Sequence, residues 1–327
     1  MLSRCARAGE AASAGGGPAP LVSVIAVNHN SGELLCRCLD ALGDAVRAPR
    51  GELLVIDNAS TDASAALLPA RFPGARFILN PINRGFGAAC NQAFALARAP
   101  FLLLVNPDAV PRPGAVDALL EHLRADPRCG VCGGQLVAGD GKPFPSARRF
   151  PSVWRTARLR AGLETEPALL PPDSAIDWVP GTCVLLRREL VEELGGFDER
   201  FFLYFEETDL CRRARRAGWR VGLARDAVVW HAGGGSARTR SEAFEESSQQ
   251  VLPWRLRSQY LYLRKHHGLA AVLADAGLEI GWHLARAAYN LRPGRGHARR
   301  ASLEVVRHAV AALAATCCGR RAPPVPW

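Results

Sequence analysis

The stretch FLLLVNPD, residues 101–108, decides the fold expected for this chain. Five consecutive apolar residues followed by Asn-Pro-Asp predict a short strand buried on both faces, as in a parallel sheet. Pro107 cannot donate to a sheet ladder, so the strand ends before it and Asp108 lies at the carboxyl end. Ligands of open α/β sheets bind at that edge. A carboxylate there, beside the amide of Asn106, suits a divalent metal held against a diphosphate.

Three further apolar runs precede this strand, at 22–27, 53–56 and 77–79, and each is followed by residues with helical spacing. Strands that alternate with helices predict right-handed βαβ crossovers. We therefore expect an α/β fold with a doubly wound, mostly parallel sheet flanked by helices. Later strands are predicted at 130–137, 184–186, 221–223 and 228–231.

Composition divides the chain into three regions. Residues 1–20 form an Ala/Gly/Ser/Pro leader that we expect to be disordered. Residues 21–240 hold the α/β domain, and residues 241–327 form a mainly helical, basic extension with 12 Lys or Arg against 6 Asp or Glu. Within the domain, 139–176 is predicted to be a surface excursion. Its Trp154 and its arginines either touch an acceptor or lie on the surface, and the surface interpretation is favoured.

The net charge of +10 suggests an anionic partner, although the bias toward Arg over Lys can reflect base composition alone. No interleaving of aromatic and basic residues points to nucleic acid. The apolar stretch 270–291 contains Asp275, Glu279 and Arg286, which makes it too polar to span a bilayer. No secretory signal is visible. Among the ten cysteines, Cys129 and Cys132 have the spacing of a redox or zinc pair, but no second Cys or His pair accompanies them, so small buried hydrophobes are favoured over a metal site or a disulfide framework. A cytoplasmic location is expected.

Short polar side chains follow all four predicted parallel strands, at Asn28–Asn30, Asp57–Asn58, Asn80–Asn83 and Asn106–Asp108. Asn and Asp are common turn residues, so any one loop could be structural. Together they offer hydrogen-bonding groups for a base, a ribose and a metal diphosphate at one sheet edge. The sequence therefore predicts a nucleotide-sugar site.

Two other groups could carry chemistry. Glu206, Glu207 and Asp209 open a predicted helix, where acids also stabilise the helix dipole. An acid there within reach of an acceptor hydroxyl could act as general base. His231 ends a predicted strand before the glycines at 233–235, which is consistent with a metal ligand or with a structural histidine.

Several motifs occur together and in a fixed order over residues 21–235. They are VSVIAVNHN (22–30), VIDNASTD (55–62), NRGFG (83–87) with Asn91, LVNPD (104–108), and GGFDERFFLYFEETD (195–209) followed by Trp230-His231. As a set they resemble family 2 glycosyltransferases, and most closely the rhamnosyltransferase-like branch. The resemblance implies a GT-A fold and a cytoplasmic enzyme of cell wall or polysaccharide biosynthesis.

The resemblance also implies a reaction. The sugar of a dTDP- or UDP-linked donor, with rhamnose as a candidate, would pass with inversion to a hydroxyl of a glycan or lipid-linked acceptor. Glu207 would be the general base, with Glu206 and Asp209 as supporting acids, and Asp108 and His231 would hold Mg²⁺ or Mn²⁺. Trp178 and Gly181 would line the acceptor side. The donor-binding residues would be Val27, Asn28, Asn30, Asp57, Asn58, Asn83, Arg84, Gly85 and Asn106.

This chain departs from the family pattern at two positions, since Asn106 and Glu207 each replace an Asp. Both retain hydrogen-bonding ability or the functional group. A catalytically inactive nucleotide-sugar-binding module of the same fold is the alternative. The basic extension could contact an anionic membrane at its inner face, which would suit a lipid-linked acceptor, or simply pack on the catalytic domain.

Overall fold

The computed structural model describes residues 19–47, 49–165, 176–231, 251–292 and 295–324. The predictions for most of the leader, for the glycines at 233–235 and for the boundary at 240/241 lie outside these residues. The strands are β1 (Val22–Asn28), β2 (Gly51–Asn58), β3 (Arg76–Asn80), β4 (Phe101–Val105), β5 (Ala109–Pro111), β6 (Cys129–Val137), β7 (Cys183–Arg187) and β8 (Arg220–His231).

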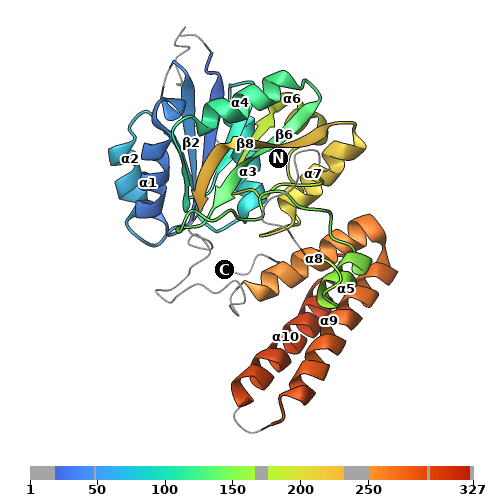
Figure 1. Cartoon of the computed structure of the whole chain (residues 1–327). Helices are drawn as coiled ribbons and strands as arrows, with labels where there is room; N and C mark the ends of the chain where they lie inside the picture. The colour runs from blue at the N-terminus through green and yellow to red at the C-terminus, as the bar shows by residue number, and fades with distance from the viewer. Residues whose placement is uncertain (1–18, 48, 166–175, 232–250, 293–294, 325–327) are drawn as a thin grey trace, which may run out of the picture.

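Helices cover both faces of the sheet and continue beyond it (Figure 1). They are α1 (Gly32–Ala41), the 3-10 turn η1 (Gly43–Val46), α2 (Ser64–Arg71), α3 (Phe86–Leu96), α4 (Ala115–Ala125), α5 (Val153–Arg160), α6 (Arg188–Leu194), α7 (Glu206–Arg216), α8 (Leu252–His267), α9 (Leu269–Tyr289) and α10 (Gly296–Ala315).

One eight-stranded sheet has the order β3-β2-β1-β4-β7-β6-β8-β5. The first four strands are parallel, as their alternation with helices predicts, and β7 is antiparallel to both of its neighbours. Strand β4 has the bounds expected from FLLLV. The stretch predicted as two strands, 221–223 and 228–231, is the single strand β8, because a register shift opposite Gly134 and Gln135 absorbs the residues between them.

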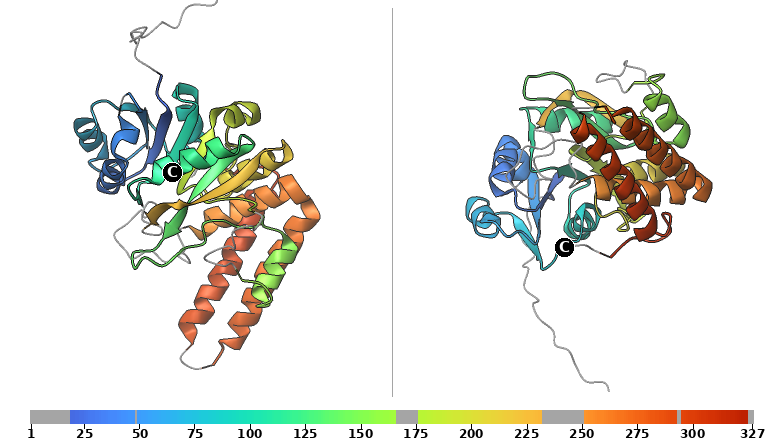
Figure 2. Two further views of the ribbon diagram at one scale, coloured as in Figure 1. Left: turned by 45° about the horizontal axis from the view of Figure 1, so that its top comes forward. Right: turned by 90° about the horizontal axis from the view of Figure 1, so that it is seen from below.

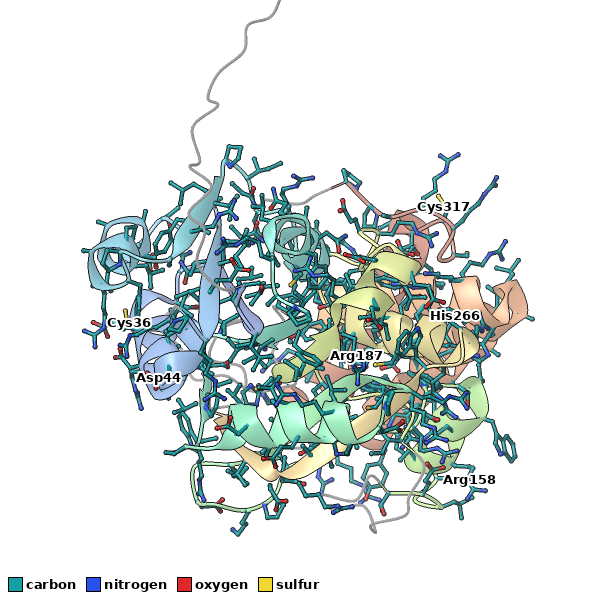
Figure 3. All side chains as sticks on the ribbon, turned by 90° about the horizontal axis from the view of Figure 1, so that it is seen from above. Cys36, Asp44, Arg158, Arg187, His266 and Cys317 are labelled. Carbon is teal, nitrogen blue, oxygen red and sulfur yellow. The ribbon has the colours of Figure 1, made fainter. Side chains whose placement is uncertain are left out.

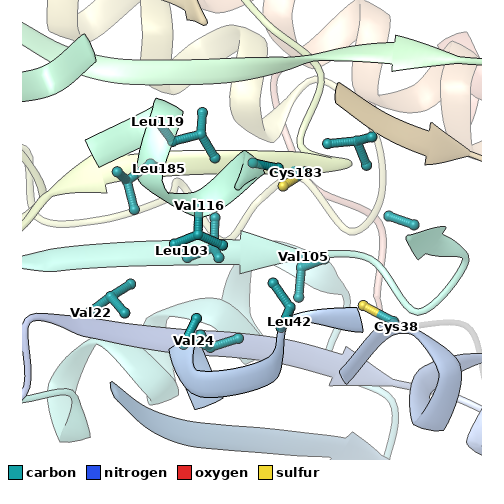
Figure 4. Packing of buried hydrophobic residues seen from close by; sticks show 14 of the residues in the cluster. Val22, Val24, Cys38, Leu42, Leu103, Val105, Val116, Leu119, Cys183 and Leu185 are labelled. Carbon is teal, nitrogen blue, oxygen red and sulfur yellow. The ribbon is translucent and has the colours of Figure 1, made fainter. Parts of the chain in front are cut away.

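The parallel strands are buried on both sides, with alternate residues in two different cores. On β1 and β4, Val24 and Leu103 pack on the α1 and α4 side, whereas Ile25 and Leu104 pack on the α3 and α7 side. Figure 4 shows the first of these cores around Leu103. Burial on both faces explains why each strand reads as a continuous apolar run.

Among the described cysteines, seven are buried, none forms a disulfide, and Cys317 is exposed, at the molecular rim in Figure 3. The interpretation of most of them as small hydrophobes is confirmed. Within the described part of the chain, every helix is too short or too polar to cross a membrane.

Helices α8–α10 form a third core around Leu256, Tyr260, Val272 and Ala309. Phe201, from the segment before α7, is buried in the same core. Helices α9 and α10 run side by side and project from the sheet, and α5 packs against α9 (Figures 1 and 2). The excursion at 139–176 therefore reaches the C-terminal helices.

Candidate active site

A single cavity of about 1010 Å³ lies at the carboxyl edge of β1, β2 and β4 and extends to α5, α7 and α8. Most of the residues predicted for the site line it. They are Val27, Asn58, Asn83, Gly85, Asn106, Asp108, Trp178, Gly181, Glu206, Glu207 and His231. The predicted residues outside its lining are Asn28, Asn30, Asp57, Arg84 and Asp209.

Asp108 and His231 meet because of strand pairing. Ala109 on β5 lies opposite His231 on β8, which places the preceding Asp108 beside the imidazole. The Oδ2 atom of Asp108 is 3.5 Å from Nε2 of His231, and the carboxylate is buried. A carboxylate and an imidazole facing one cavity are both metal-ligand types.

The polar strand ends bond chiefly to one another. Asn58 donates to Asn83 at 2.9 Å and to the carbonyl of Gly85 at 3.1 Å. Its Oδ1 atom accepts from Asn80 Nδ2 at 3.0 Å and from the Arg84 amide at 3.1 Å. The prediction that these loops converge is therefore confirmed, and much of their hydrogen bonding serves to hold the loops in place.

Asp57, which does not line the cavity, is likewise held by hydrogen bonds between neighbouring loops. It accepts from Asn28 Nδ2 at 2.8 Å and from the Ser60 hydroxyl at 2.6 Å. Asn30 Oδ1 accepts from the Thr61 amide at 2.7 Å. These bonds fix the loops beside Val27 and His29, which do line the cavity.

Glu206 and Glu207 enter the cavity from a strained turn. Tyr204 and Phe205 have φ values of 69° and 68°, a left-handed conformation that non-glycine residues seldom adopt. Such strain persists where surrounding structure enforces it and is frequent at functional sites. Gly85 abuts this turn, because a Cβ there would lie 2.4 Å from the Phe202 carbonyl oxygen. The Phe86 amide donates to that same oxygen at 2.9 Å.

Burial raises the pKa of both glutamates. For Glu206, burial and then the neighbouring Glu207 charge hold the pKa well above its usual range. For Glu207, burial raises the pKa while backbone bonds, one of them with Gly181, and the positive charge of Arg148 oppose the rise. Oε2 of Glu207 has no hydrogen-bond partner among the described residues. A carboxylate with a raised pKa and a spare oxygen is suited to accept a proton.

Asp209 serves a different purpose from its neighbours. It is fully buried and pairs with Arg213 at 2.8 Å, with Lys265 at 2.6 Å and with His266 at 2.7 Å. His266, labelled in Figure 3, belongs to α8. Asp209 therefore joins α7 to the C-terminal helices.

The surface interpretation of the 139–176 arginines is wrong for Arg148, Arg155 and Arg160, which are partly buried and line the cavity. Arg149 also lines the cavity, but its side chain is 55% exposed, as predicted. The surface interpretation is also correct for Trp154, which is 74% exposed. Sequence patterns alone did not reveal that these arginines line a cavity, because α8 and α9, which complete that part of the cavity, follow more than 90 residues later in the chain. Arg255 and Trp254 of α8 were missed for the same reason.

Comparisons with known proteins agree with this architecture. The family model described as Glycosyl transferase family 2 matches residues 23–195. An N-acetylglucosaminyl-diphospho-decaprenol L-rhamnosyltransferase of Mycobacterium tuberculosis is 33% identical over 239 residues, which cover 64% of this chain and 76% of that protein. A galactofuranosyltransferase of Mycolicibacterium smegmatis is 27% identical over 285 residues, 80% of this chain and 89% of that protein.

Among solved structures, a mannosyltransferase from Pyrobaculum calidifontis in complex with GDP-Man and Mn²⁺ has a similar fold. Its TM-score is 0.55 at 17% identity, over 90% of this chain and 87% of that chain. At this level of identity the similarity concerns the fold alone.

Proposed function

The chain belongs to glycosyltransferase family 2 and has the GT-A fold, and from this premise we propose that it transfers a sugar with inversion from a nucleoside diphosphate sugar to an acceptor hydroxyl. The observation that carries the proposal is one cavity lined by Asp108, by His231 of β8 and by Glu207 of α7. A single displacement needs groups on opposite sides of the sugar, and we propose that these residues supply them.

Asp108 and His231 are the residues that would hold a divalent metal. Among the described residues no group of three or more His, Cys, Asp or Glu side chains has metal-binding geometry. Two protein ligands nevertheless fit Mg²⁺ or Mn²⁺ in a nucleotide site, because these ions retain waters and take further ligands from substrate phosphates. When bound, such an ion would neutralise charge on the leaving diphosphate.

Glu207 is proposed as the general base. Its raised pKa favours uptake of the acceptor's hydroxyl proton, and Arg148 lies close enough to influence its charge. Glu206, which has an even stronger tendency to stay protonated, would place a neutral acid beside it. One proton is then shared across the pair, since two adjacent buried carboxylates do not ionise together readily. Asn106 would contact the donor ribose, and Trp178 and Gly181 the acceptor.

A set of variants distinguishes catalysis from binding without turnover. We expect Glu207→Gln to abolish transfer while nucleotide binding stays intact, and Asp108→Asn to weaken metal-dependent binding of the nucleoside diphosphate. Glu192→Gln, at an exposed position on α6, is the matched control, and its transfer activity and nucleotide binding should equal those of the native chain. Donor cleavage, transfer and titration calorimetry are the measurements. Nucleotide binding without any transfer by the native chain would favour the inactive binding module instead.

The donor is proposed to be UDP- or dTDP-linked, with rhamnose as the first sugar to test because the 33% identical relative is a rhamnosyltransferase. The acceptor is proposed to be lipid-linked, as that relative's name describes for its own acceptor. Release of nucleoside diphosphate from a panel of nucleotide sugars, with and without Mn²⁺, tests both the donor and the metal. Equal release without any divalent ion would contradict the metal proposal.

Contact with an anionic membrane is proposed for α9 and α10. Helix α9 buries two acidic residues and exposes three large apolar ones. Asp275 and Glu279 are buried, whereas Leu273, Trp282 and Leu284 are 51%, 47% and 48% exposed. The exposed side of α10 adds arginines 299, 300 and 307. Leu273 and Leu284 lie about 20° apart around the helix axis and so share one face of α9. Exposed apolar side chains together with basic ones match the interface of an anionic bilayer.

Co-sedimentation tests this contact with vesicles of phosphatidylcholine alone or with phosphatidylglycerol. The double variant Leu273→Ser/Leu284→Ser should lose binding to the anionic vesicles. Leu79→Ser, at an exposed apolar position on β3, is the control and should still bind. Equal pelleting of all three chains would remove α9 from the proposal.

A further inference from the structure

Part of the cavity lining comes from α5, α8, α9 and the segment before α5. We call this the arginine arm and define it by Arg148, Arg149, Arg155, Arg160 and Arg255, all of which line the cavity. Leu159 and Trp254 add apolar surface to the same arm. Helices α5, α8 and α9 lie below α7 and the sheet in Figure 1.

The arm has an excess of positive charge. One carboxylate, Glu279, lines it together with the five arginines. Behind the lining, Arg149 pairs with Asp177 at 3.1 Å and Arg155 pairs with Glu164 at 2.7 Å. Arg160 donates to Glu279 itself. Three of the arginines are thus held in place by carboxylates, while the arm as a whole stays cationic.

Two arginines have donors to spare. The Nη1 atom of Arg160 is buried and has no hydrogen-bond partner among the described residues. Arg255 makes one long bond of 3.4 Å to Gln259, and no described carboxylate lies within ion-pair distance of it. A buried guanidinium nitrogen without a partner is costly unless a ligand satisfies it. Guanidinium groups match phosphate oxygens in a bidentate manner.

We propose that the arginine arm binds the diphosphate of a lipid-linked acceptor, with Arg160 and Arg255 as the principal donors. The inference rests on the proposed function and adds to it the chemical class of the acceptor. The donor's diphosphate is proposed to lie at Asp108 and His231, so the two diphosphates would occupy different parts of one cavity, which Glu207 also lines.

Helix α9 connects the arm with the proposed membrane surface. Its Glu279 lines the arm, whereas Leu273 and Leu284 are exposed on another face of the helix. The chain of a lipid whose diphosphate lies in the arm would extend past the apolar lining residues Leu159 and Trp254. A soluble glycan acceptor would need neither the arginines nor this apolar lining.

Citronellyl diphosphate, a short prenyl diphosphate, is a suitable probe for titration calorimetry on the full chain. We expect binding to the native chain and a loss of affinity of about tenfold in Arg255→Gln, the size expected for one charge-assisted hydrogen bond. Arg124→Gln, which removes the same charge from an exposed position on α4, should bind like the native chain. Arg255 is exposed, so its variant should retain the native unfolding temperature.

Three results would overturn the inference. Equal affinity of Arg255→Gln and the native chain, or no binding to either, would remove the arm as a diphosphate site. Competitive displacement of the probe by UDP or dTDP would show that these arginines serve the donor. Equal affinity for methyl diphosphate and citronellyl diphosphate would exclude recognition of the lipid chain. Donor cleavage is measured separately, so its absence would refute the proposed function while probe binding still decides the role of the arm.

Discussion

Replacing Asp209 by Asn tests how the C-terminal helices support the site. The Asp209 carboxylate is fully buried and contacts three side chains, Arg213 on its own helix and Lys265 and His266 on α8. Arg216 contacts Nδ1 of His266 at 3.2 Å, which leaves Nε2–H to donate to Asp209. The histidine is therefore neutral, and Asp209 is the carboxylate partner of Arg213 and, together with Asp198, of Lys265.

Asparagine keeps one acceptor but removes the charge, so Arg213 loses its buried counter-ion and Lys265 keeps only Asp198, at 2.8 Å. Breaking a buried ion pair in this way costs about 3–5 kcal/mol. The midpoint of thermal unfolding should fall by about 6 °C or more. Transfer activity should also decrease, because α7 carries Glu207 two positions before Asp209.

The pH dependence gives a second measurement. Burial would raise the pKa of Asp209, but the bonds from His266 and Lys265 and the Arg213 charge lower it below its usual value. A lowered carboxyl pKa stabilises the fold above the unfolded-state value of about 4, and this contribution disappears as pH falls through the folded pKa. The difference between native chain and variant should therefore be full at pH 7 and shrink below about pH 4.

Differential scanning calorimetry and transfer assays on the two chains provide the comparison. Asp117→Asn is the matched control, since Asp117 forms an exposed ion pair with Arg50 that contributes at most about 1 kcal/mol. If Asp209→Asn were no less stable than Asp117→Asn at pH 7, the proposed attachment of α7 to α8 would be refuted.

Two further substitutions follow from local geometry. Gly85→Ala should destabilise the chain by more than about 2 kcal/mol and impair nucleotide binding, because φ is +85° and the new methyl would meet the Phe202 carbonyl. The control Gly114→Ala, at φ +82° with open space, should lower the free energy of unfolding in urea by only about 1 kcal/mol. Equal losses of stability in the two variants would contradict the close approach of Gly85 to Phe202. Burial raises the pKa of Asp275 to about 6 despite the bond from Gln259, so its ionisation destabilises the fold as pH rises through 6. Asp275→Asn should therefore stabilise the chain by about 2 kcal/mol at pH 8 and by less near pH 5, whereas a constant gain at both pH values would contradict this ionisation.

The strands and their polar ends could be predicted from the sequence because their signals are local. The run before Asn106 predicted β4 to the residue, since five apolar residues and a following proline leave few alternatives. The four polar loops were expected at one edge because parallel strands must bring their carboxyl ends together. The family motifs likewise lie within or next to single elements.

Only the tertiary structure decided which of these side chains face the cavity. Glu207 and Asp209 are two residues apart, yet one lines the cavity and the other is buried against α8. The sequence placed Arg160 in a predicted surface segment. In the structure, α9, which begins more than 100 residues later, packs against α5, and Arg160 donates to its Glu279. The reason is physical: periodicity fixes which face of an element is apolar, but contacts between distant segments determine what that face meets, and here they also turn the acids of α9 inward.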